Sequence, residues 1–306
     1  MQDEAGYSKI AMLEALEIRL SALLPASAPG PARLTAAQRY TLLLPGKRVR
    51  GLLALMVTQS WGQPWQKGLD LAAALEMVHA ASLIIDDLPC MDDAALRRGA
   101  PSAHVEFGEA TATLAAIGLM NHAFSVVAAD AGLSADQRID AVAALATAIG
   151  PAGLTGGQEE DVNGPARATE DIERVHAAKT GALFVAAAAL GTIAGGVGGA
   201  PRQAMADFGL ALGNAFQAFD DLIDVLGNAA TAGKPVGQDA GRSNLAGATC
   251  VDSAIARAEG HLDHAIKCLE ASGAAHDRIA AYVGDIVDRL RKDAGGLAPR
   301  RSATRP

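Results

Sequence analysis

Apolar residues recur at spacings of three and four along most of the chain, which is the period of helices with a buried face. The clearest runs are Ile10 to Leu24, Leu52 to Val57, Leu69 to Ile85 and Leu114 to Ala129. Further helices are expected near Thr169 to Ile193, Gln203 to Leu226, Asp252 to Ala271 and His276 to Arg291. No stretch shows sustained alternation of β-branched with polar residues, so the pattern predicts an all-α fold.

Several helix ends are also readable. The segment Ser134 to Gln137 is a capping box that opens a helix, and Pro151 stops that helix after about Ile149. The breaks rich in Gly and Pro are short, and none shifts the composition enough to mark a domain boundary. We therefore predict one domain over residues 1–306, a bundle of about ten helices with a core at about 10–292 and a disordered basic tail at 297–306.

The chain has 306 residues, of which half are hydrophobic and 4% aromatic, and a formal net charge of −8. This charge argues against general attraction to nucleic acid, so an anionic ligand must meet a local cluster of Lys and Arg. The cysteines, Cys90, Cys250 and Cys268, are odd in number and form no CxxC pair, which argues against a disulfide framework or a zinc site. Free thiols fit a reducing, cytoplasmic environment.

The first residues lack the basic-then-apolar pattern of a signal peptide. One uncharged segment, Gly181 to Ala200, is about long enough to span a membrane. It is rich in Ala and Gly and ends in a glycine-rich run at 195–199, so we interpret it as a buried core helix followed by a loop. We expect no transmembrane segment.

Two clusters of aspartates lie in otherwise apolar surroundings: Asp86-Asp87 with Asp92-Asp93, and Asp220-Asp221 with Asp224. Carboxylates this close repel one another unless cations neutralise them, and buried charges need a partner or a metal. Two such clusters facing one cavity would suit Mg²⁺, which typically takes one or two carboxylates plus substrate phosphates. Phosphate-ester or diphosphate chemistry is therefore the first hypothesis.

Each acidic cluster also has an alternative interpretation that involves no metal. The second cluster shares one helix face with Gln217, because the spacings are three and four, and its apolar neighbours disfavour a merely solvated acidic face. The first cluster cannot be regular helix throughout, because Pro89 lacks a donor and disfavours helix before it. We expect the helix to end or kink there, which lets Asp92 turn back toward Asp86; the alternative is a plain acidic turn.

Candidate anion contacts surround these clusters. His79 and Ser82 share a helical stripe with Asp86, which makes His79 a candidate phosphate contact rather than a plain core histidine. A helix is expected to begin near three cationic residues, Lys47, Arg48 and Arg50. Their charges and the first backbone amides of that helix would concentrate positive charge at one point. Other basic residues follow the acidic clusters along the chain: Arg97, Arg98 and Lys234. Lys179 interrupts an apolar helix face, and the alternative interpretation is a lysine that extends its charged end to solvent.

Taken together, these segments resemble the trans-isoprenyl diphosphate synthase family. The first acidic cluster is similar to the family's DDxxxxD motif and is followed by LRRG at 96–99, and the second is similar to its DDxxD. Between them, residues 157–161 resemble its GQxxD and Lys179-Thr180 its KT. The resemblance runs from about Leu43 to Asn244. Any one of these motifs is weakly specific, but their shared order is highly specific.

The resemblance implies a helical bundle around a central cavity, usually a homodimer, that condenses isopentenyl diphosphate with allylic diphosphates. It implies about three Mg²⁺ ions, ligated by Asp86, Asp92 and Asp220. The supporting carboxylates would be Asp87, Asp161, Asp221 and Asp224. The allylic diphosphate would be held by Arg97, Lys179 and Lys234, and isopentenyl diphosphate by Lys47, Arg50, His79 and Arg98. Thr180 and Gln217 would lie near the developing cation.

The chain departs from the family pattern in three places. The family's GGKRxRP is Pro45 to Gly51 here and loses a glycine and the proline. Its GKST is Gly241 to Asn244, where Arg242 keeps the charge. The His often found just before the first motif is Ile85. None of these changes removes an expected metal ligand.

Product length is expected to depend on a steric stop, since each added isoprene unit buries more apolar surface and would otherwise bind better. In the family, the fifth residue before the first motif is often aromatic where the product has fifteen carbons. Here it is Ala81, followed by Ser82, so the resemblance implies a twenty-carbon product, geranylgeranyl diphosphate. The motif at 88–92 also looks like carotenoid-pathway members. A wall lower in the cavity would instead give farnesyl diphosphate.

Two rival functions remain. A class I terpene cyclase shares the first motif, but its second motif typically mixes Asn, Ser and Glu, and it takes no second diphosphate for Lys47, Arg50 and Arg98 to hold. A non-catalytic synthase subunit should have lost metal ligands, which this chain keeps.

Overall fold

The structure, a computed structural model, describes residues 2–27, 30–164, 169–226 and 251–294, with side chains from residue 9 onward. The chain first forms α1 (Gln2–Leu23), α2 (Ala32–Leu42), α3 (Val49–Ser60), η1 (Trp65–Gly68) and α4 (Leu69–Asp86). A small hairpin, β1 (Leu96–Arg97) and β2 (Ala100–Pro101), leads to α5 (Ala103–Phe107), α6 (Glu109–Ala129), α7 (Ala135–Ile149) and α8 (Leu154–Asn163). The remaining elements are α9 (Thr169–His176), η2 (Ala177–Gly181), α10 (Ala182–Gly195), α11 (Gly199–Leu226), α14 (Val251–Ala271) and α15 (Asp277–Asp293).

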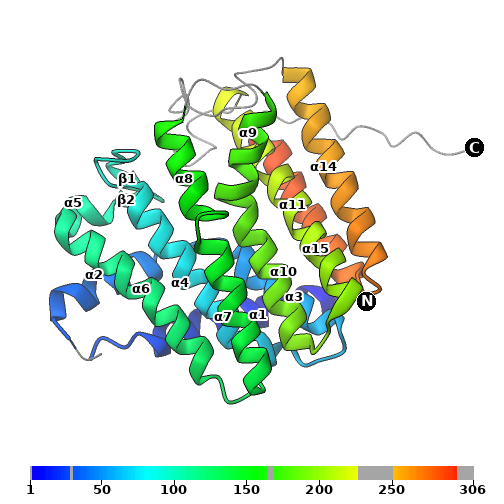
Figure 1. Cartoon of the computed structure of the whole chain (residues 1–306), viewed down its shortest axis with the longest axis horizontal. Helices are drawn as coiled ribbons and strands as arrows, with labels where there is room; N and C mark the ends of the chain where they lie inside the picture. The colour runs from blue at the N-terminus through cyan, green and yellow to red at the C-terminus, as the bar shows by residue number, and fades with distance from the viewer. Residues whose placement is uncertain (1, 28–29, 165–168, 227–250, 295–306) are drawn as a thin grey trace, which may run out of the picture.

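The helices run roughly parallel and antiparallel in one bundle, which confirms the predicted all-α fold (Figure 1). The carboxyl ends of α4 and α11 lie at the same end of this bundle, beside α8 and the start of α9 (Figure 1). Both acidic clusters are therefore carried to one end of the molecule. The prediction that residues 1–306 form one domain stays a prediction.

The only strands among the described residues form a hairpin of two residues each, which the sequence pattern did not predict. Leu96 pairs with Pro101 and Arg97 with Ala100. Arg98 and Gly99 connect them with φ angles of 55° and 78°, the left-handed pair of a tight hairpin turn. Such short strands carry no alternation of apolar and polar residues, so periodicity could not reveal them.

The bundle is tight because small residues lie where helices meet. At Gly191 on α10 a Cβ would lie 2.5 Å from the carbonyl oxygen of Ala54 on α3. At Gly209 on α11 a Cβ would lie 2.7 Å from the carbonyl oxygen of Phe184 on α10. Backbones that approach this closely leave no room for a side chain between them.

Most predicted helix positions agree with the structure. The capping box is confirmed, because Gln137 N donates to Ser134 Oγ and Ser134 N donates to Gln137 Oε1. The predicted core helix at 181–200 is confirmed as α10, most of which is buried. The predicted helix at 169–193 is divided by the wider turn η2. Helices α2 and α8 were missed, because polar residues and paired glycines obscure their periodicity.

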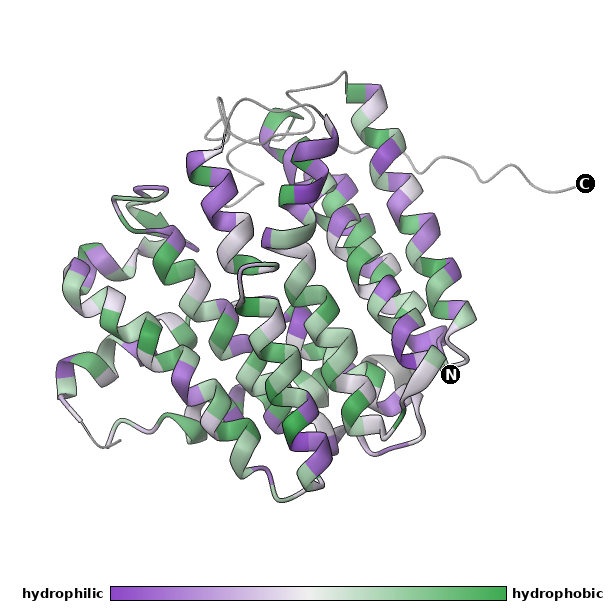
Figure 2. Cartoon of the chain, viewed as in Figure 1, coloured by the Kyte–Doolittle hydropathy of each residue, from purple (hydrophilic) through white to green (hydrophobic). Residues whose placement is uncertain are grey.

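Within the part of the chain that the structure describes, four helices are long and apolar enough to cross a membrane by length and composition: 65–86, 109–129, 135–163 and 169–195. The apolar windows of the first and last are 72% and 67% buried, so these two lie mostly inside the protein. Those of the middle two, which include α6 and α7, are only 39% and 22% buried. Figure 2 shows hydrophobic residues recurring along α6 and α7.

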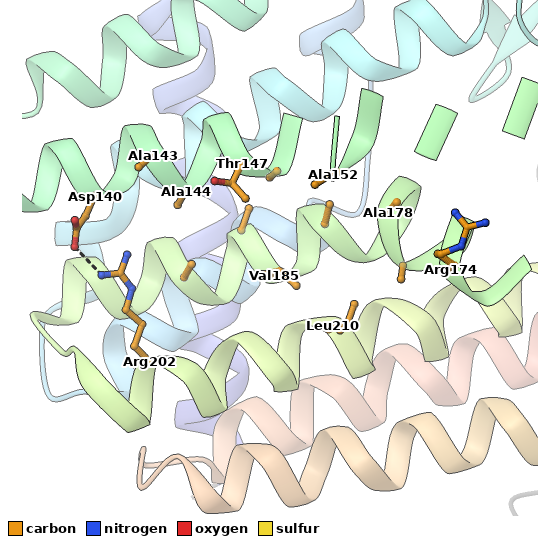
Figure 3. A pocket seen from close by; sticks show the side chains of 16 residues that line it. Asp140, Ala143, Ala144, Thr147, Ala152, Arg174, Ala178, Val185, Arg202 and Leu210 are labelled. Atoms are coloured by element: carbon orange, nitrogen blue, oxygen red, sulfur yellow. Dashed lines mark hydrogen bonds and ion pairs between the residues drawn. The ribbon is translucent and has the colours of Figure 1, made fainter. Parts of the chain in front are cut away.

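A groove of about 550 Å³ runs alongside α7 (Figure 3). Its wall is mostly alanine from α7, η2 and α10, with Val185 and Leu210. An ion pair from Arg202 Nη1 to Asp140 Oδ2, 2.6 Å long, lies at one end of it (Figure 3). Helix α7 thus carries both an exposed apolar residue, Ile139, and part of the wall of this groove.

Candidate active site

The first acidic cluster is a turn that folds back on the end of α4. The helix ends at Asp86, directly before the segment that contains Pro89. The amide of Asp92 then donates to the carbonyl oxygen of Asp86 at 2.9 Å, and Asp93 takes a φ of 48°. This confirms the predicted end of the helix and the return of Asp92 toward Asp86.

The carboxyl of Asp86 is in an unusual electrostatic environment. Burial raises its pKa to about 6; Lys179 lowers the pKa, whereas Asp92 raises it. A carboxylate held among other carboxylates in a poorly solvated position gains strongly from a cation placed beside it. Asp86 is therefore well suited to ligate a divalent metal.

Asp87 and Arg97 form an ion pair across the cluster. Arg97 Nε donates to Asp87 Oδ1 at 3.0 Å, and Arg97 Nη2 makes a second contact to the same carboxylate. Burial raises the pKa of Asp87 despite this partner. The β1–β2 hairpin thus holds Arg97 over the first cluster, and Asp87 fixes the direction of its guanidinium.

The second cluster lies in the last turns of α11. Asp221 and Asp224 are buried, while Asp220 is half-buried. Gln217 Nε2 donates to Asp221 Oδ1 at 2.9 Å, and His176 Nε2 lies 3.6 Å from Asp221 Oδ2. Gln217, Asp221 and His176 thus form a connected polar network on the face that the sequence predicted for Gln217 and the aspartates.

A π-helical turn, η2, carries the KT pair. Lys179 Nζ lies 2.8 Å from Asp161 Oδ2 on α8, and Thr180 Oγ1 donates to Gln217 Oε1 at 2.7 Å. Burial alone would lower the pKa of Lys179, but Asp86 and Asp161 raise it. The lysine therefore stays charged between the first cluster and α8. Wider turns of this kind are frequent at functional sites, since they redirect side chains within a helix.

A second group of cations lies at the start of α3. Arg50 Nη1 lies 3.5 Å from His79 Nε2, and its guanidinium stacks over Phe184 with 4.8 Å to the ring centroid. Among the described residues, Arg50 Nε has no hydrogen-bond partner. Burial lowers the pKa of Arg50 to about 10. Burial, together with the nearby charge of Arg50, holds the pKa of His79 well below its usual value. Near neutral pH this pair is a charged guanidinium beside a neutral imidazole.

The interpretation of Lys47, Arg48 and Arg50 as three cations at one point is wrong for Arg48. Its side chain is 2% exposed and turns into the protein, where Nε lies 2.7 Å from Glu17 Oε1. A φ of 45° at Arg48 reverses the side-chain direction relative to its neighbours. Lys47 is exposed. Spacing alone could not show that the chain enters α3 in a left-handed conformation.

Arg98 completes this cationic group. It occupies the hairpin turn, and its Nη1 lies 3.3 Å from the carbonyl oxygen of Leu44 and 3.4 Å from that of Pro45. A Cβ on Gly46 would lie 2.4 Å from Arg98 Nη1, so a larger residue there would displace the end of this arginine side chain. The hairpin thus carries Arg97 toward the acidic cluster and Arg98 toward the start of α3.

A cavity of about 430 Å³ adjoins Asp86. Its wall includes Ser82 and Ile85 of α4, Met120 of α6, and Leu154 and Gln158 of α8. Ala81 is fully buried and is not part of this wall, whereas the neighbouring Ser82 is. Of the two positions expected to control product length, the structure therefore brings Ser82 to the cavity.

Some predicted features fall elsewhere or were missed. Lys234 and the segment Gly241 to Asn244 lie outside the described residues. His176 was missed because a lone histidine in an amphipathic helix gives no signal of its partner Asp221. Phe184 was missed because an aromatic residue in an apolar helix is ordinarily core.

Across the described ranges, no three His, Cys, Asp or Glu side chains lie close enough to form a ready metal site. The residues do supply carboxylates of the type Mg²⁺ prefers, gathered at one end of the bundle with cations nearby. Mg²⁺ is commonly bound by one or two carboxylates together with substrate phosphates. The donor set therefore fits a metal that is shared with a phosphorylated substrate.

Comparison with known proteins identifies the family. Residues 31–283 match the polyprenyl synthetase family. A geranylgeranyl diphosphate synthase from Pseudescherichia vulneris is 38% identical over 84% of this chain and 84% of its own length. A farnesyl diphosphate synthase from Geobacillus stearothermophilus is 39% identical over 69% of this chain and 72% of its own.

The fold comparison agrees. The structure of an FPP/GFPP synthase from Zymomonas mobilis superposes with a TM-score of 0.82 and 29% identity, over 94% of this chain and 100% of the other. A geranyltransferase from Legionella pneumophila gives the same TM-score at 27% identity, over 95% and 98%. The chain therefore belongs to the polyprenyl synthetase family, as a short-chain trans-prenyltransferase of isoprenoid biosynthesis.

Proposed function

We propose that this prenyltransferase condenses isopentenyl diphosphate with allylic diphosphates in a Mg²⁺-dependent reaction whose main product is geranylgeranyl diphosphate. The observation that carries the proposal is the grouping at one end of the bundle. Carboxylates from α4 and α11 lie there with Lys179, while a separate cationic group lies at the start of α3. The carboxylates with Lys179 would hold one diphosphate through metal ions, and the cations at the start of α3 would hold a second one directly.

The allylic diphosphate belongs on the acidic side of this grouping. Asp86, Asp92 and Asp220, supported by Asp87 and Asp224, would hold up to three Mg²⁺ ions, which supply positive charge that stabilises the departing diphosphate. Lys179 and Arg97 donate to its oxygens from fixed directions, because Asp161 and Asp87 orient them. Charge that develops on the leaving group thus meets side chains already in place.

The departing diphosphate leaves a cationic allylic carbon that needs a partly negative surrounding. The hydroxyl of Thr180 donates a hydrogen bond to Gln217, so its oxygen lone pairs would stay available to the cation. The amide of Gln217 is fixed in turn by Asp221. Both side chains are thereby held rigidly in a direction that would favour the cation over the neutral substrate.

Isopentenyl diphosphate belongs on the other cationic group. Arg50, His79, Lys47 and Arg98 would bind its phosphates, and the unpaired Nε of Arg50 marks a position where an anion is needed. The double bond of this substrate attacks the allylic cation, and one proton is then lost to the released diphosphate. No protein nucleophile is required.

Product length follows from the cavity beside Asp86. Its apolar residues Ile85, Met120 and Leu154, with the small Ser82, would contact the growing chain, while Gln158 and Glu159 form a polar part of the wall. A relative named geranylgeranyl diphosphate synthase and one named farnesyl diphosphate synthase are similarly close to this chain. Farnesyl diphosphate is thus the alternative product, and Met120 and Leu154 are the side chains that would impose it.

We also propose a homodimer. The apolar residues Leu114 and Ile117 of α6 and Ile139 of α7 are exposed, and α7 also contributes to the wall of the alanine-lined groove (Figure 3). A second copy that covers this face would remove from water side chains that a monomer leaves exposed.

The decisive experiment incubates the purified protein with isopentenyl diphosphate and each of the five-, ten- and fifteen-carbon allylic diphosphates, with Mg²⁺ or with a chelator. We expect Mg²⁺-dependent elongation that stops at twenty carbons. No elongation would overturn the enzymatic proposal in favour of a non-catalytic subunit. A cyclic hydrocarbon from the allylic substrate alone would indicate a terpene cyclase, and a stop at fifteen carbons would give the alternative product.

A further inference from the structure

Glu76, in the middle of α4, is a buried carboxylate that no expected substrate contact uses. Its Oε1 accepts a hydrogen bond from the amide of Gly51 at 2.9 Å. Its Oε2 lies 3.6 Å from Arg48 Nη1, and both side chains are 2% exposed. One carboxylate therefore links α4 to the first turn of α3 and to the loop before it.

The hydrogen bond from Gly51 to Glu76 caps the amino end of α3 with a side chain from another helix. The first amides of a helix lack partners within it, and the residue preceding α3, Arg48, makes no side-chain cap. Glu76 satisfies the amide of Gly51 and places a negative charge at the positive end of α3. The position of the first turn of α3, which carries Arg50, is thus set by a residue of α4.

Gly51 is suited to this contact by its lack of a side chain. A Cβ there would lie 2.7 Å from Leu16 Cδ2 and 3.1 Å from Glu76 Cγ, so no larger residue fits without movement. The related motif has proline at this position, which has no amide proton to donate. This chain therefore replaces a rigid proline by an amide–carboxylate hydrogen bond.

Arg48 is the second part of the arrangement. Besides Glu17 and Glu76, its Nη2 donates to the carbonyl oxygen of Leu42 at 2.8 Å. These partners stabilise the left-handed φ of 45°, which would otherwise be unfavourable for arginine. Because Arg48 turns inward, its neighbours Lys47 and Arg50 are left to face the expected diphosphate.

We propose that Glu76 is a positioning residue for the isopentenyl diphosphate group of the site. It acts through Gly51 and Arg48 on the direction of Lys47 and Arg50. His79, which contacts Arg50, lies one turn further along the same helix, so α4 fixes both sides of that contact. This inference rests on the proposed function for the identity of the bound diphosphate.

The test compares Glu76→Ala, which removes both contacts, with Glu76→Gln, which keeps an oxygen for the amide of Gly51. Steady-state assays vary isopentenyl diphosphate and geranyl diphosphate separately. We expect Glu76→Ala to raise the KM for isopentenyl diphosphate about tenfold, Glu76→Gln to raise it less, and the KM for geranyl diphosphate to change under about twofold.

The matched control is Asp70→Asn on the same helix. Asp70 forms an ion pair with Arg19 of α1, with an Oδ1–Nε distance of 2.5 Å, so its loss also weakens the contact between α1 and α4. We expect it to lower the melting temperature and to leave the ratio of the two KM values unchanged. A Glu76→Ala variant that behaves like this control, or that raises both KM values equally, would overturn the inference.

Two further measurements keep the inference testable. If Glu76→Ala does not fold, Glu76→Gln decides, because its size and its acceptor oxygen are retained. If the wild type shows no elongation, the proposed function fails independently. Calorimetric titration of isopentenyl diphosphate onto the wild type and Glu76→Gln then tests positioning, and equal affinities would refute it.

Discussion

Lys179 Nζ lies 2.8 Å from Asp161 Oδ2, across the gap between η2 and α8. The π-helical turn brings this lysine out of the regular helical register, and the carboxylate fixes its direction. Charge held in place before substrate binds needs little reorganisation when negative charge develops. The pair therefore joins an irregularity of the backbone to the proposed chemistry.

Replacing Lys179 by Met keeps most of its apolar volume and removes its charge. We expect kcat to fall by ~10²–10³, because a fixed cation facing the leaving group is lost. The KM for isopentenyl diphosphate should change little. Lys267→Met, on the exposed side of α14, is the matched control and should keep full activity in the same Mg²⁺-dependent assay. A small fall in kcat would mean that Lys179 only completes the ion pair with Asp161.

The raised pKa of Asp86 implies that a carboxylate needed for activity destabilises the metal-free fold near neutral pH. Its pKa in the folded protein is about 6, above the ordinary 3.8, so the folded state binds a proton more tightly than the unfolded state. Its contribution to stability is therefore favourable at low pH and is lost as pH rises from about 4 to 6. Above that window, without metal, the buried carboxylate destabilises the fold.

We expect Asp86→Asn to abolish elongation and yet raise the free energy of unfolding by ~1–2 kcal/mol at pH 7.5 with a chelator present. At pH 5 the gain should shrink, because the wild-type carboxyl is then mostly protonated. Melting temperatures at the two pH values measure this difference, and Asp263→Asn at an exposed position of α14 is the control. An Asp86→Asn variant that melts lower than the wild type at pH 7.5 would contradict the expectation.

The close approach of α3 and α10 at Gly191 predicts a large effect of one methyl group. Gly191→Ala would place Cβ 2.5 Å from the carbonyl oxygen of Ala54, so the helices must separate. We expect a loss of ~1–3 kcal/mol in urea unfolding. Gly284→Ala on α15, where a Cβ meets nothing within 4 Å, should instead gain ~0.5–1 kcal/mol from helix propensity. Equal effects of the two changes would argue against tight packing of α3 on α10.

The sequence could predict the helices and the grouping of charges because both depend on local order. Spacing of three and four places Gln217 on one face with the aspartates, and Pro89 ends α4 whatever packs around it. It could not predict which neighbour covers a face. The inward turn of Arg48 depends on Glu17 and Glu76, which are distant in sequence.

The same limit applies to the two positions expected to control product length. Ala81 and Ser82 are adjacent, so they point about 100° apart on a helix, and only the packing of α4 decides which one meets a cavity. The structure gives this place to Ser82 and buries Ala81 completely. The predicted role of Ala81 stays a prediction, and Ala81→Phe should shorten the product only with a marked loss of stability.

Product length provides the last prediction. Ser82→Phe would fill the cavity of about 430 Å³ near its charged end, so we expect the product to shorten to fifteen carbons. Met120→Ala would remove bulk from the opposite wall and should allow longer products. Glu109→Gln, at an exposed position on the same helix as Met120, is the matched control and should leave product length unchanged.

Chromatography of the products from geranyl diphosphate and isopentenyl diphosphate measures each outcome. The two substitutions act in opposite directions because one adds and the other removes atoms along a single path. If Ser82→Phe still gives twenty carbons while Ala81→Phe shortens the product, the chain grows past Ala81 and the cavity at Met120 is not its path. If neither has an effect and Met120→Ala alone lengthens the product, the stop lies at α6 rather than α4.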